Sequence, residues 1–121
     1  MKFLLITSNQ AMVDEAKQGF HPSDELVTTG NWRDGLDQAE GVDLMFIDML
    51  ATLTEPHKIA GYEEFAYAKM EHPIAKGVPL VLISPPDNYE LDFLVGFPDF
   101  LMGNLQSPVD YRNFRRASTW V

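Results

Sequence analysis

VDLMFIDM (Val42–Met49) and VPLVLISP (Val78–Pro85) are short apolar runs, and each ends in one polar side chain, Asp48 in the first and Ser84 in the second. Such runs, bounded by turn-forming residues, are typical of strands buried on both faces, which form parallel sheets covered by helices. Functional groups in these sheets lie just beyond the carboxyl ends of the strands. We therefore expect Asp48 and Ser84 to face each other across one crevice.

The rest of the chain predicts three further strands and five helices. The expected strands are Lys2–Ser8, Glu25–Thr29 and a short Asp99–Met102. The expected helices are Gln10–Phe20, Trp32 to about Glu40 with Asn31 as its N-cap, Gly61–Glu71, Asp87–Val95, and a last helix with Ser107 as its N-cap and Pro108 at its first position. In Gly61–Glu71 a helical stripe is formed by Tyr62, Phe65, Ala66 and Lys69.

Strand and helix patterns alternate five times along the 121 residues, which predicts one domain spanning the whole chain. Alternation of this kind is typical of an α/β fold with right-handed crossovers. We expect a flavodoxin-like three-layer (βα)5 architecture with a five-stranded parallel sheet in the order 2-1-3-4-5. In that order the third and fourth strands are neighbours, which brings Asp48 and Ser84 to the same edge.

Composition excludes several functional classes. The chain contains no cysteine, so disulfides, thiolate metal sites and a cysteine nucleophile are excluded. A net charge of −9 argues against nucleic-acid binding, because phosphates are repelled at long range. No apolar run approaches the ~20 residues that span a bilayer, and no signal-peptide pattern opens the chain. We expect a cytoplasmic protein that does not bind membranes.

The basic residues are unevenly distributed. Arg112, Arg115 and Arg116 supply a third of the nine lysines and arginines, close to the C-terminus. One interpretation is that they complement the negative end of the last helix. The other is that they form a docking face for an acidic partner.

Four motifs follow one another along the chain. They are Asp43–Asp48 (DLMFID), Val78–Ser84 (VPLVLIS), Gly96–Leu101 (GFPDFL) and Ser107-Pro108. In this order and spacing they resemble the receiver domain of bacterial two-component response regulators, and the resemblance covers essentially the whole chain. It implies that Asp48 is the phosphoacceptor and that Ser84 hydrogen-bonds the phosphoryl group. It also implies that Phe100 falls on the aromatic position whose rotamer reports the switch.

The chain departs from this family where the family binds cations. The family closes its first strand with adjacent acidic residues that hold Mg²⁺, whereas this chain has the uncharged Thr7-Ser8-Asn9. The family's fifth strand is followed by a lysine and a proline, and we place Gly103 at the lysine position. Phosphoryl transfer depends on positioning and on neutralising the charge of the moving group. We therefore expect a pseudo-receiver that is not an enzyme and holds no cofactor, with Asp48 a weak candidate for Mg²⁺.

The resemblance also places a partner surface. In the family, the face made by the fourth helix, the fifth strand and the fifth helix carries the output. The corresponding residues here mix aromatic and arginine side chains, as interfaces do, and they are Tyr89, Phe93, Phe97, Arg112, Arg115 and Arg116. The implied partner is a histidine kinase or another signalling protein, and a homodimer stays open.

Two alternatives remain. One is a phosphoaccepting receiver that uses Asp48 despite its uncharged neighbours. The other is a flavodoxin-like domain that binds a small molecule, with Thr7 and Ser8 as hydrogen-bond donors to a phosphate. A hydrolase is not expected, because Ser84 lacks a G-x-S-x-G elbow. No metal site is expected at the histidines, whose spacing suits none; they are His21, His57 and His72.

Overall fold

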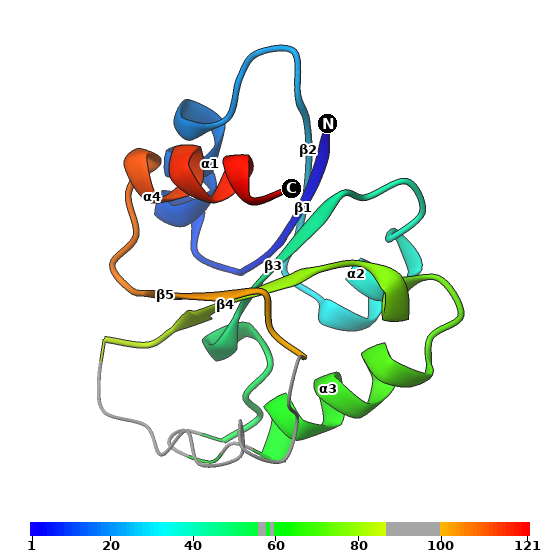
Figure 1. Ribbon diagram of the computed structural model, residues 1–121. Helices are drawn as coiled ribbons and strands as arrows, with labels where there is room; N and C mark the ends of the chain where they lie inside the picture. Colours follow the sequence, from blue (N-terminus) through cyan, green and yellow to red (C-terminus); the bar gives the residue numbers. More distant parts are fainter. Residues whose placement is uncertain (56–57, 59, 87–99) are drawn as a thin grey trace.

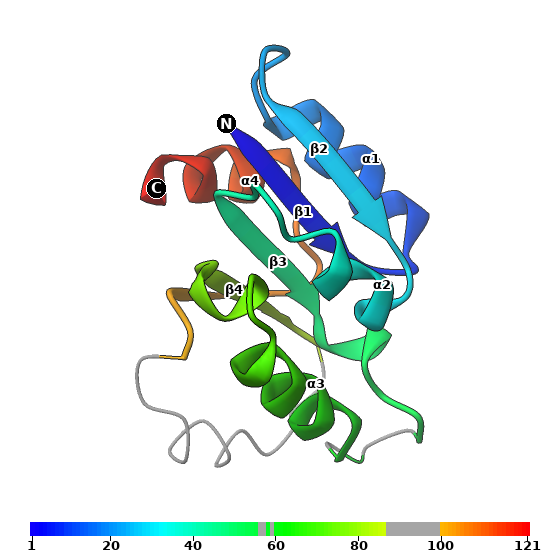
Figure 2. The ribbon, with the colours of Figure 1, turned by 90° about the vertical axis from the view of Figure 1, so that its right-hand side faces the viewer.

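The computed structural model describes residues 1–55, 58, 60–86 and 100–121. It contains one five-stranded sheet in the order β2-β1-β3-β4-β5, and all four strand pairs are parallel (Figures 1 and 2). This topology is the predicted one. The strands are β1 (Lys2–Ile6), β2 (Glu25–Thr29), β3 (Leu44–Asp48), β4 (Leu80–Ser84) and β5 (Gly103–Gln106).

Helices follow β1, β2, β3 and β5, largely as predicted. The α-helices are α1 (Gln10–Gly19), α2 (Trp32–Asp37), α3 (Ala60–Glu71) and α4 (Tyr111–Ala117). Short 3₁₀ turns are η1 (Met49–Ala51), η2 (Ala75–Gly77) and η4 (Ser118–Trp120). The predicted Asn31 cap is confirmed, since its side chain accepts from the backbone N–H groups of Arg33 and Asp34. The predicted helix Asp87–Val95 lies outside the described residues. None of the described helices combines the length and the apolar character needed to cross a membrane.

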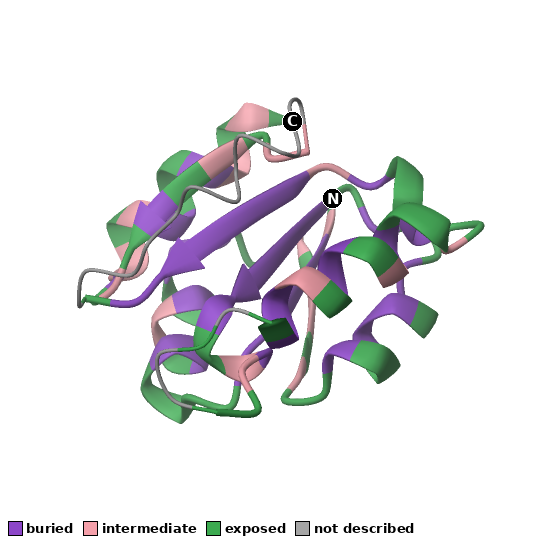
Figure 3. Ribbon diagram, turned by 90° about the horizontal axis from the view of Figure 1, so that it is seen from below, coloured by how far each residue is buried: buried purple, intermediate pink, exposed green. Residues whose placement is uncertain are grey.

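The central strands are buried on both faces, and their residues are coloured as buried in Figure 3. Helices α1 and α4 cover one face, and α2 and α3 cover the other (Figure 1). Under α1 and α4 the core is aromatic, with Phe3 stacked on Phe20 at 4.3 Å and Phe46 edge-on to Phe114 at 5.4 Å between ring centroids. Burial of these rings supplies much of the driving force for folding.

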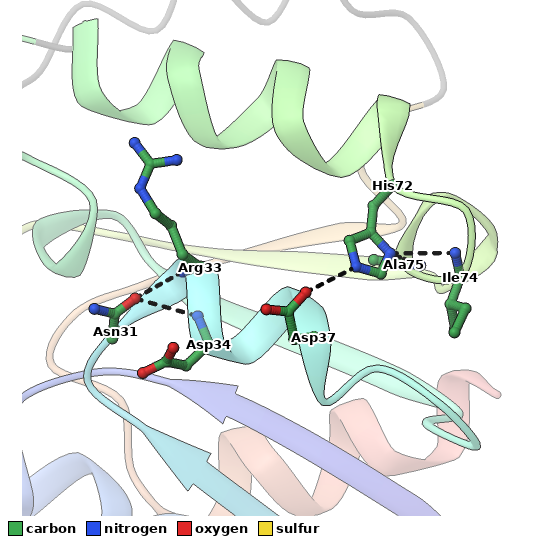
Figure 4. Close-up of polar contacts among 7 residues, drawn as sticks. All are labelled: Asn31, Arg33, Asp34, Asp37, His72, Ile74 and Ala75. Carbon is green, nitrogen blue, oxygen red and sulfur yellow. Dashed lines mark hydrogen bonds and ion pairs between the residues drawn. The ribbon is translucent and has the colours of Figure 1, made fainter.

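Helices α2 and α3 are tied together by His72 (Figure 4). Its Nδ1 accepts hydrogen bonds from the backbone N–H groups of Ile74 and Ala75, at 3.2 Å and 3.0 Å. Because Nδ1 is an acceptor, the ring proton lies on Nε2, which donates to Oδ1 of Asp37 at 3.2 Å. Both ring nitrogens are therefore occupied in positioning the end of α3.

The fifth strand is not where the sequence predicted it. The expected strand Asp99–Met102 is wrong, because β5 runs from Gly103 to Gln106. This strand lies at the edge of the sheet, pairs only with β4, and buries only Leu105, so it lacks an apolar run. The apolar residues just before β5 pack against the core instead of forming the strand. One of them, Met102, is joined to β4, because its N–H donates a hydrogen bond to the Leu80 carbonyl at 2.8 Å.

The start of the last helix also differs from the prediction. Ser107 is not its N-cap, because its N–H donates to the Ser84 carbonyl at 2.8 Å and so continues the pairing of β5 with β4. The N-cap is Asp110, whose side chain accepts from the N–H groups of Arg112 and Asn113. Asn113 in turn accepts from the N–H of Asp110, which completes a capping box.

Candidate functional site

Three polar side chains lie buried at the carboxyl ends of neighbouring strands. Thr7 follows β1, Asp48 ends β3 and Ser84 ends β4, with exposed fractions of 4%, 5% and 6%. The N–H of Thr7 donates to the Thr29 carbonyl at 2.9 Å, which fixes Thr7 beside the end of β2. These polar groups therefore gather at the carboxyl ends of the strands, where the sequence predicted the site.

Asp48 is held by neutral donors. The Thr7 hydroxyl donates to Oδ2 at 2.7 Å, and the N–H of Leu50 donates to Oδ1 at 3.2 Å. The N–H of Asn9 donates to the Thr7 hydroxyl at 3.1 Å and so orients it toward the carboxylate. Burial raises the pKa of Asp48 above its ordinary value, although both hydrogen bonds oppose this shift. Ionised Asp48 is therefore costly in this setting.

Ser84 is bonded to a different neighbour. Its hydroxyl accepts from Nδ2 of Asn104 at 3.0 Å and lies 3.2 Å from the Asn104 Oδ1. Asp48 continues the alternation of Phe46, which packs under α1 and α4, whereas Ser84 continues that of Leu82 on the opposite face. Asp48 and Ser84 both lie at the carboxyl ends of their strands. Asp48 is hydrogen-bonded to Thr7, which follows β1, whereas Ser84 is hydrogen-bonded to Asn104 of β5.

The residues present do not fit a Mg²⁺ site. Mg²⁺ in proteins is held by oxygen ligands in octahedral geometry, usually with one or two carboxylates. Among the described residues no three His, Cys, Asp or Glu side chains gather where they could hold a metal ion. Both oxygens of Asp48 already accept hydrogen bonds. The acidic side chains of α1 are also engaged, Asp14 by Gln10 and Glu15 by the N–H of Tyr111 at 2.8 Å.

The position that the resemblance gives to a lysine is occupied by Ser107. We predicted Gly103 there, which is wrong, because Gly103 begins β5 and the residue between β5 and the proline is Ser107. Gly103 has a packing role instead, since a Cβ on it would lie 2.7 Å from the Trp120 ring. The correction leaves an uncharged hydroxyl in place of a cation.

The structure describes both Phe100, which the resemblance places at the switch position, and Asn104, which lies in β5. Phe100 precedes β5 and packs with the core under α2 and α3, with its ring centroid 5.4 Å from Nζ of Lys69. Asn104, which no motif of the sequence marks as a site residue, is the hydrogen-bond partner of Ser84. The signal that identifies its strand is the alternation of Asn104 and Gln106 around the buried Leu105, typical of an edge strand.

The arginines of the predicted partner surface lie on α4. Arg112, Arg115 and Arg116 are all exposed, and the guanidinium groups of the first two lie 5.6 Å and 5.2 Å from the Tyr111 ring centroid. These contacts hold two of the three cations over an aromatic face. The other predicted members of the surface lie outside the described residues; they are Tyr89, Phe93 and Phe97.

An opening in the surface lies at the carboxyl ends of β1 and β2. Its volume is about 290 Å³, and hydroxyl groups dominate its polar lining. Thr7 and Ser8, the predicted hydrogen-bond donors to a phosphate, both line this opening. Thr28, Thr29 and the first residues of α1 line it as well. The opening is therefore the location that the small-molecule alternative requires.

No protein-family model matches this chain, and no curated protein matches its sequence. Solved structures of response regulators match it along nearly its full length. CheY4 of Vibrio cholerae superposes with a TM-score of 0.71 at 16% identity, covering 98% of this chain and 95% of its own. A two-component response regulator from Legionella pneumophila gives 0.71 at 14% identity, with coverages of 99% and 95%.

A third match carries a metal ion. It is the receiver domain of the sensor histidine kinase PA1611 from Pseudomonas aeruginosa, with magnesium coordinated in its active-site cleft. The TM-score is 0.67 at 12% identity, and 98% of this chain and 95% of that chain are covered. At such identities a structural match establishes the architecture and not the chemistry. The chain has the fold of CheY-like response regulator receiver domains.

Proposed function

We propose that this chain is an atypical receiver-like domain of signal transduction, with a degenerate phosphorylation pocket, that acts mainly through contact with a protein partner. One observation carries the proposal: the buried Asp48 carboxylate accepts from the Thr7 hydroxyl and the Leu50 N–H. Neutral donors thus occupy the place where phosphoryl transfer needs cations. The carboxylate is a structural acceptor between two strands.

The chemistry of phosphoryl transfer supports this view. The protein's contribution to such a reaction is positioning and stabilisation of charge on the transferred group, supplied by metal ions and by Lys or Arg. The side chains at the carboxyl ends of the strands are instead hydroxyl groups, at Thr7, Ser84 and Ser107, together with the amide of Asn104, which is hydrogen-bonded to Ser84. Nothing in that set neutralises a phosphoryl group.

The charge distribution supports a role in binding. The molecule carries a net charge of −9, yet the exposed side of α4 presents Arg112, Arg115 and Arg116 together. A basic face on an acidic protein orients an acidic partner during encounter. The partner class that suits this surface and this fold is a histidine kinase or another signalling protein with an acidic docking site.

The pocket is tested with a small phosphodonor and MgCl₂, followed by intact mass spectrometry of wild type and Asp48→Asn. We expect no adduct of one phosphoryl group that depends on Asp48. A typical receiver domain treated in parallel verifies the donor. An adduct on wild type that Asp48→Asn abolishes contradicts the degenerate pocket and supports the phosphoaccepting alternative.

The partner face is tested by affinity capture from an extract of the native cells. The double variant Arg115→Glu/Arg116→Glu is compared with Lys17→Glu/Lys58→Glu, which changes the net charge equally at exposed sites outside α4. We expect a bound signalling protein to be lost with the arginine variant and kept with the lysine variant. Equal capture by both variants excludes α4 as the docking face.

A second candidate function rests on the opening of about 290 Å³ lined by Thr7, Ser8, Thr28 and Thr29. Hydroxyl groups at the carboxyl ends of parallel strands suit a phosphate-bearing ligand such as a flavin nucleotide. Titration with flavin mononucleotide, followed by quenching of its fluorescence, separates the two functions. Saturable binding that Thr28→Val/Thr29→Val weakens favours the small-molecule function, and no quenching favours the protein-interaction function.

A further inference from the structure

Lys69 lies buried on α3, far from the ends of the strands that hold Asp48. Its exposed fraction is only 3%, and Nζ donates to the Val78 carbonyl at 2.8 Å. Nζ also lies 5.4 Å from the centroid of the Phe100 ring. Lysine is seldom buried so completely unless an opposite charge accompanies it. In the described part of the chain, no ion pair includes Lys69.

Lys69 lines a cavity of about 390 Å³ beside the amino end of β4. The cavity is bounded by the end of α3, by η2 and by the segment that leads into β5, which Figure 2 shows beside η2. Among the residues that the structure describes, the charged side chains of its lining are Lys69 and Lys76. Most of the remaining wall is apolar and comprises Met70, Val78, Pro79, Phe100, Leu101 and Met102. This volume falls in the range of small-molecule sites, which are mainly apolar with few polar anchors.

The ammonium group of Lys69 has unused hydrogen-bonding capacity. It carries three N–H donors, and one of them is taken by Val78. Burial lowers its pKa to about 8 because the charged form is poorly solvated. A bound anion next to Nζ relieves this cost, since the attraction between opposite charges is strong where water is excluded.

We propose that this cavity binds a small monocarboxylate with an apolar body, its carboxylate bonded to Lys69 Nζ and its carbon skeleton against Phe100 and Met102. A single negative charge matches Lys69, the buried cation of the described lining, whereas a phosphate dianion needs more donors than these described residues offer. The apolar part of the ligand gains from leaving water against a carbon-lined wall. Lys76 lies exposed at the rim and adds a second attractive charge. This proposal does not rest on the proposed signalling function.

The test is calorimetric titration of the protein with hexanoate and, as a neutral analogue of the same shape, hexanamide. We expect hexanoate to bind one site with a Kd of ~1 mM or tighter and hexanamide to bind at least tenfold more weakly. Lys69→Met is expected to weaken hexanoate binding at least tenfold. Lys17→Met, at an exposed position of α1, is the matched control and is expected to bind as wild type does.

Two further readouts on wild type keep the proposal testable if Lys69→Met does not fold. Amide shifts on adding hexanoate are expected at Val78, Leu80 and Met102 and not at the threonines of the other opening. At pH 8 binding is expected to take up protons, seen as a dependence of the heat on the buffer's ionisation enthalpy, because the carboxylate favours charged Lys69. Absence of saturable binding, equal binding of hexanamide, or shifts confined elsewhere overturns the proposal.

Discussion

The hydroxyl of Thr7 donates a 2.7 Å hydrogen bond to Oδ2 of Asp48 across the ends of β1 and β3. The Thr7 hydroxyl is itself oriented by the Asn9 N–H, and the other Asp48 oxygen accepts from Leu50. This chain of neutral donors satisfies a buried carboxylate without a cation. The cost of ionising Asp48 then becomes a measurable property of the fold.

Asp48→Asn is expected to stabilise the protein at neutral pH. Burial raises the folded-state pKa of Asp48 above its ordinary value of 3.8, so the folded state holds this proton more tightly than the unfolded state does. The contribution of protonated Asp48 is present below pH ~4 and is lost as the pH rises through the folded-state pKa. Asparagine stays neutral, so we expect a gain of roughly 1 kcal/mol at pH 7 that disappears by pH 4.

The measurement for this variant is urea unfolding between pH 4 and pH 7. Asp14→Asn, which changes an exposed carboxylate of α1, is the control for the loss of one negative charge. A wild type that becomes more stable relative to Asp48→Asn as the pH rises contradicts the raised pKa.

Thr7→Asp is expected to create a response to Mg²⁺ that wild type lacks. A carboxylate at this position lies against Asp48, whose Oδ2 is 2.7 Å from the present hydroxyl. Repulsion between the two charges is expected to cost about 1–3 kcal/mol without metal. Mg²⁺ favours sites with one or two carboxylates and should restore much of that loss.

Thermal unfolding of Thr7→Asp in MgCl₂, against NaCl of equal ionic strength, measures this effect. Thr28→Asp, at the end of the neighbouring β2, controls for the added charge. If wild type gains as much from MgCl₂ as Thr7→Asp does, its pocket already holds the ion and is not degenerate.

The interior of the sheet was predictable because its burial is written into the sequence as apolar runs. Val42–Met49 and Val78–Pro85 contain β3 and β4, strands whose residues are all buried, and runs of this kind leave little choice of structure. The helical stripe of α3 was equally clear, and its four members Tyr62, Phe65, Ala66 and Lys69 are all buried. Lys69 in that stripe was the one sign of the cavity beside β4.

The edge of the sheet was not predictable in the same way. Strand β5 pairs on one side only, so Gly103–Gln106 needs a single buried side chain and has no apolar run. Because Phe100-Leu101-Met102 is apolar, the strand was predicted there, four residues before its actual position. That error displaced Gly103 onto the lysine position and hid Asn104, because site residues on a short edge strand depend on register.

Wild type is expected to gain stability at alkaline pH, and Lys69→Met is expected to lack this gain. Burial lowers the folded-state pKa from 10.5 to about 8, so the unfolded state binds more protons in that window. Wild-type stability therefore rises with pH between about 8 and 10.5, by up to about 3 kcal/mol from this group. Methionine does not titrate, so the stability of Lys69→Met relative to that of wild type falls across the same pH window.

Urea unfolding of both proteins at several pH values from 7 to 10 tests this prediction. Burial raises the pKa of the Tyr62 phenol, which affects wild type and variant alike and cancels in the comparison. Lys17→Met, with an exposed lysine removed, should follow wild type at every pH. A constant difference between Lys69→Met and wild type contradicts the lowered pKa.

Gly61→Ala is expected to destabilise the protein, although helix propensity alone predicts a gain of about 1 kcal/mol. A Cβ at Gly61 would lie 2.1 Å from the Thr52 carbonyl oxygen, a backbone atom that no side-chain rotation relieves. Thr52 is fixed in turn, because its N–H and hydroxyl both donate to the Met49 carbonyl. Separating α3 from this turn should cost roughly 2–4 kcal/mol.

The matched control is Gly77→Ala, where a Cβ meets nothing within 4 Å and a change within about 0.5 kcal/mol is expected. Urea unfolding measures both variants, and the amide shift of Leu50 reports whether the turn after Asp48 has moved. We expect that shift in Gly61→Ala alone, because η1 carries the N–H that bonds Asp48. Equal stability of the two variants means that α3 yields without disturbing η1, and the close approach of Gly61 to Thr52 then plays no part in holding Asp48.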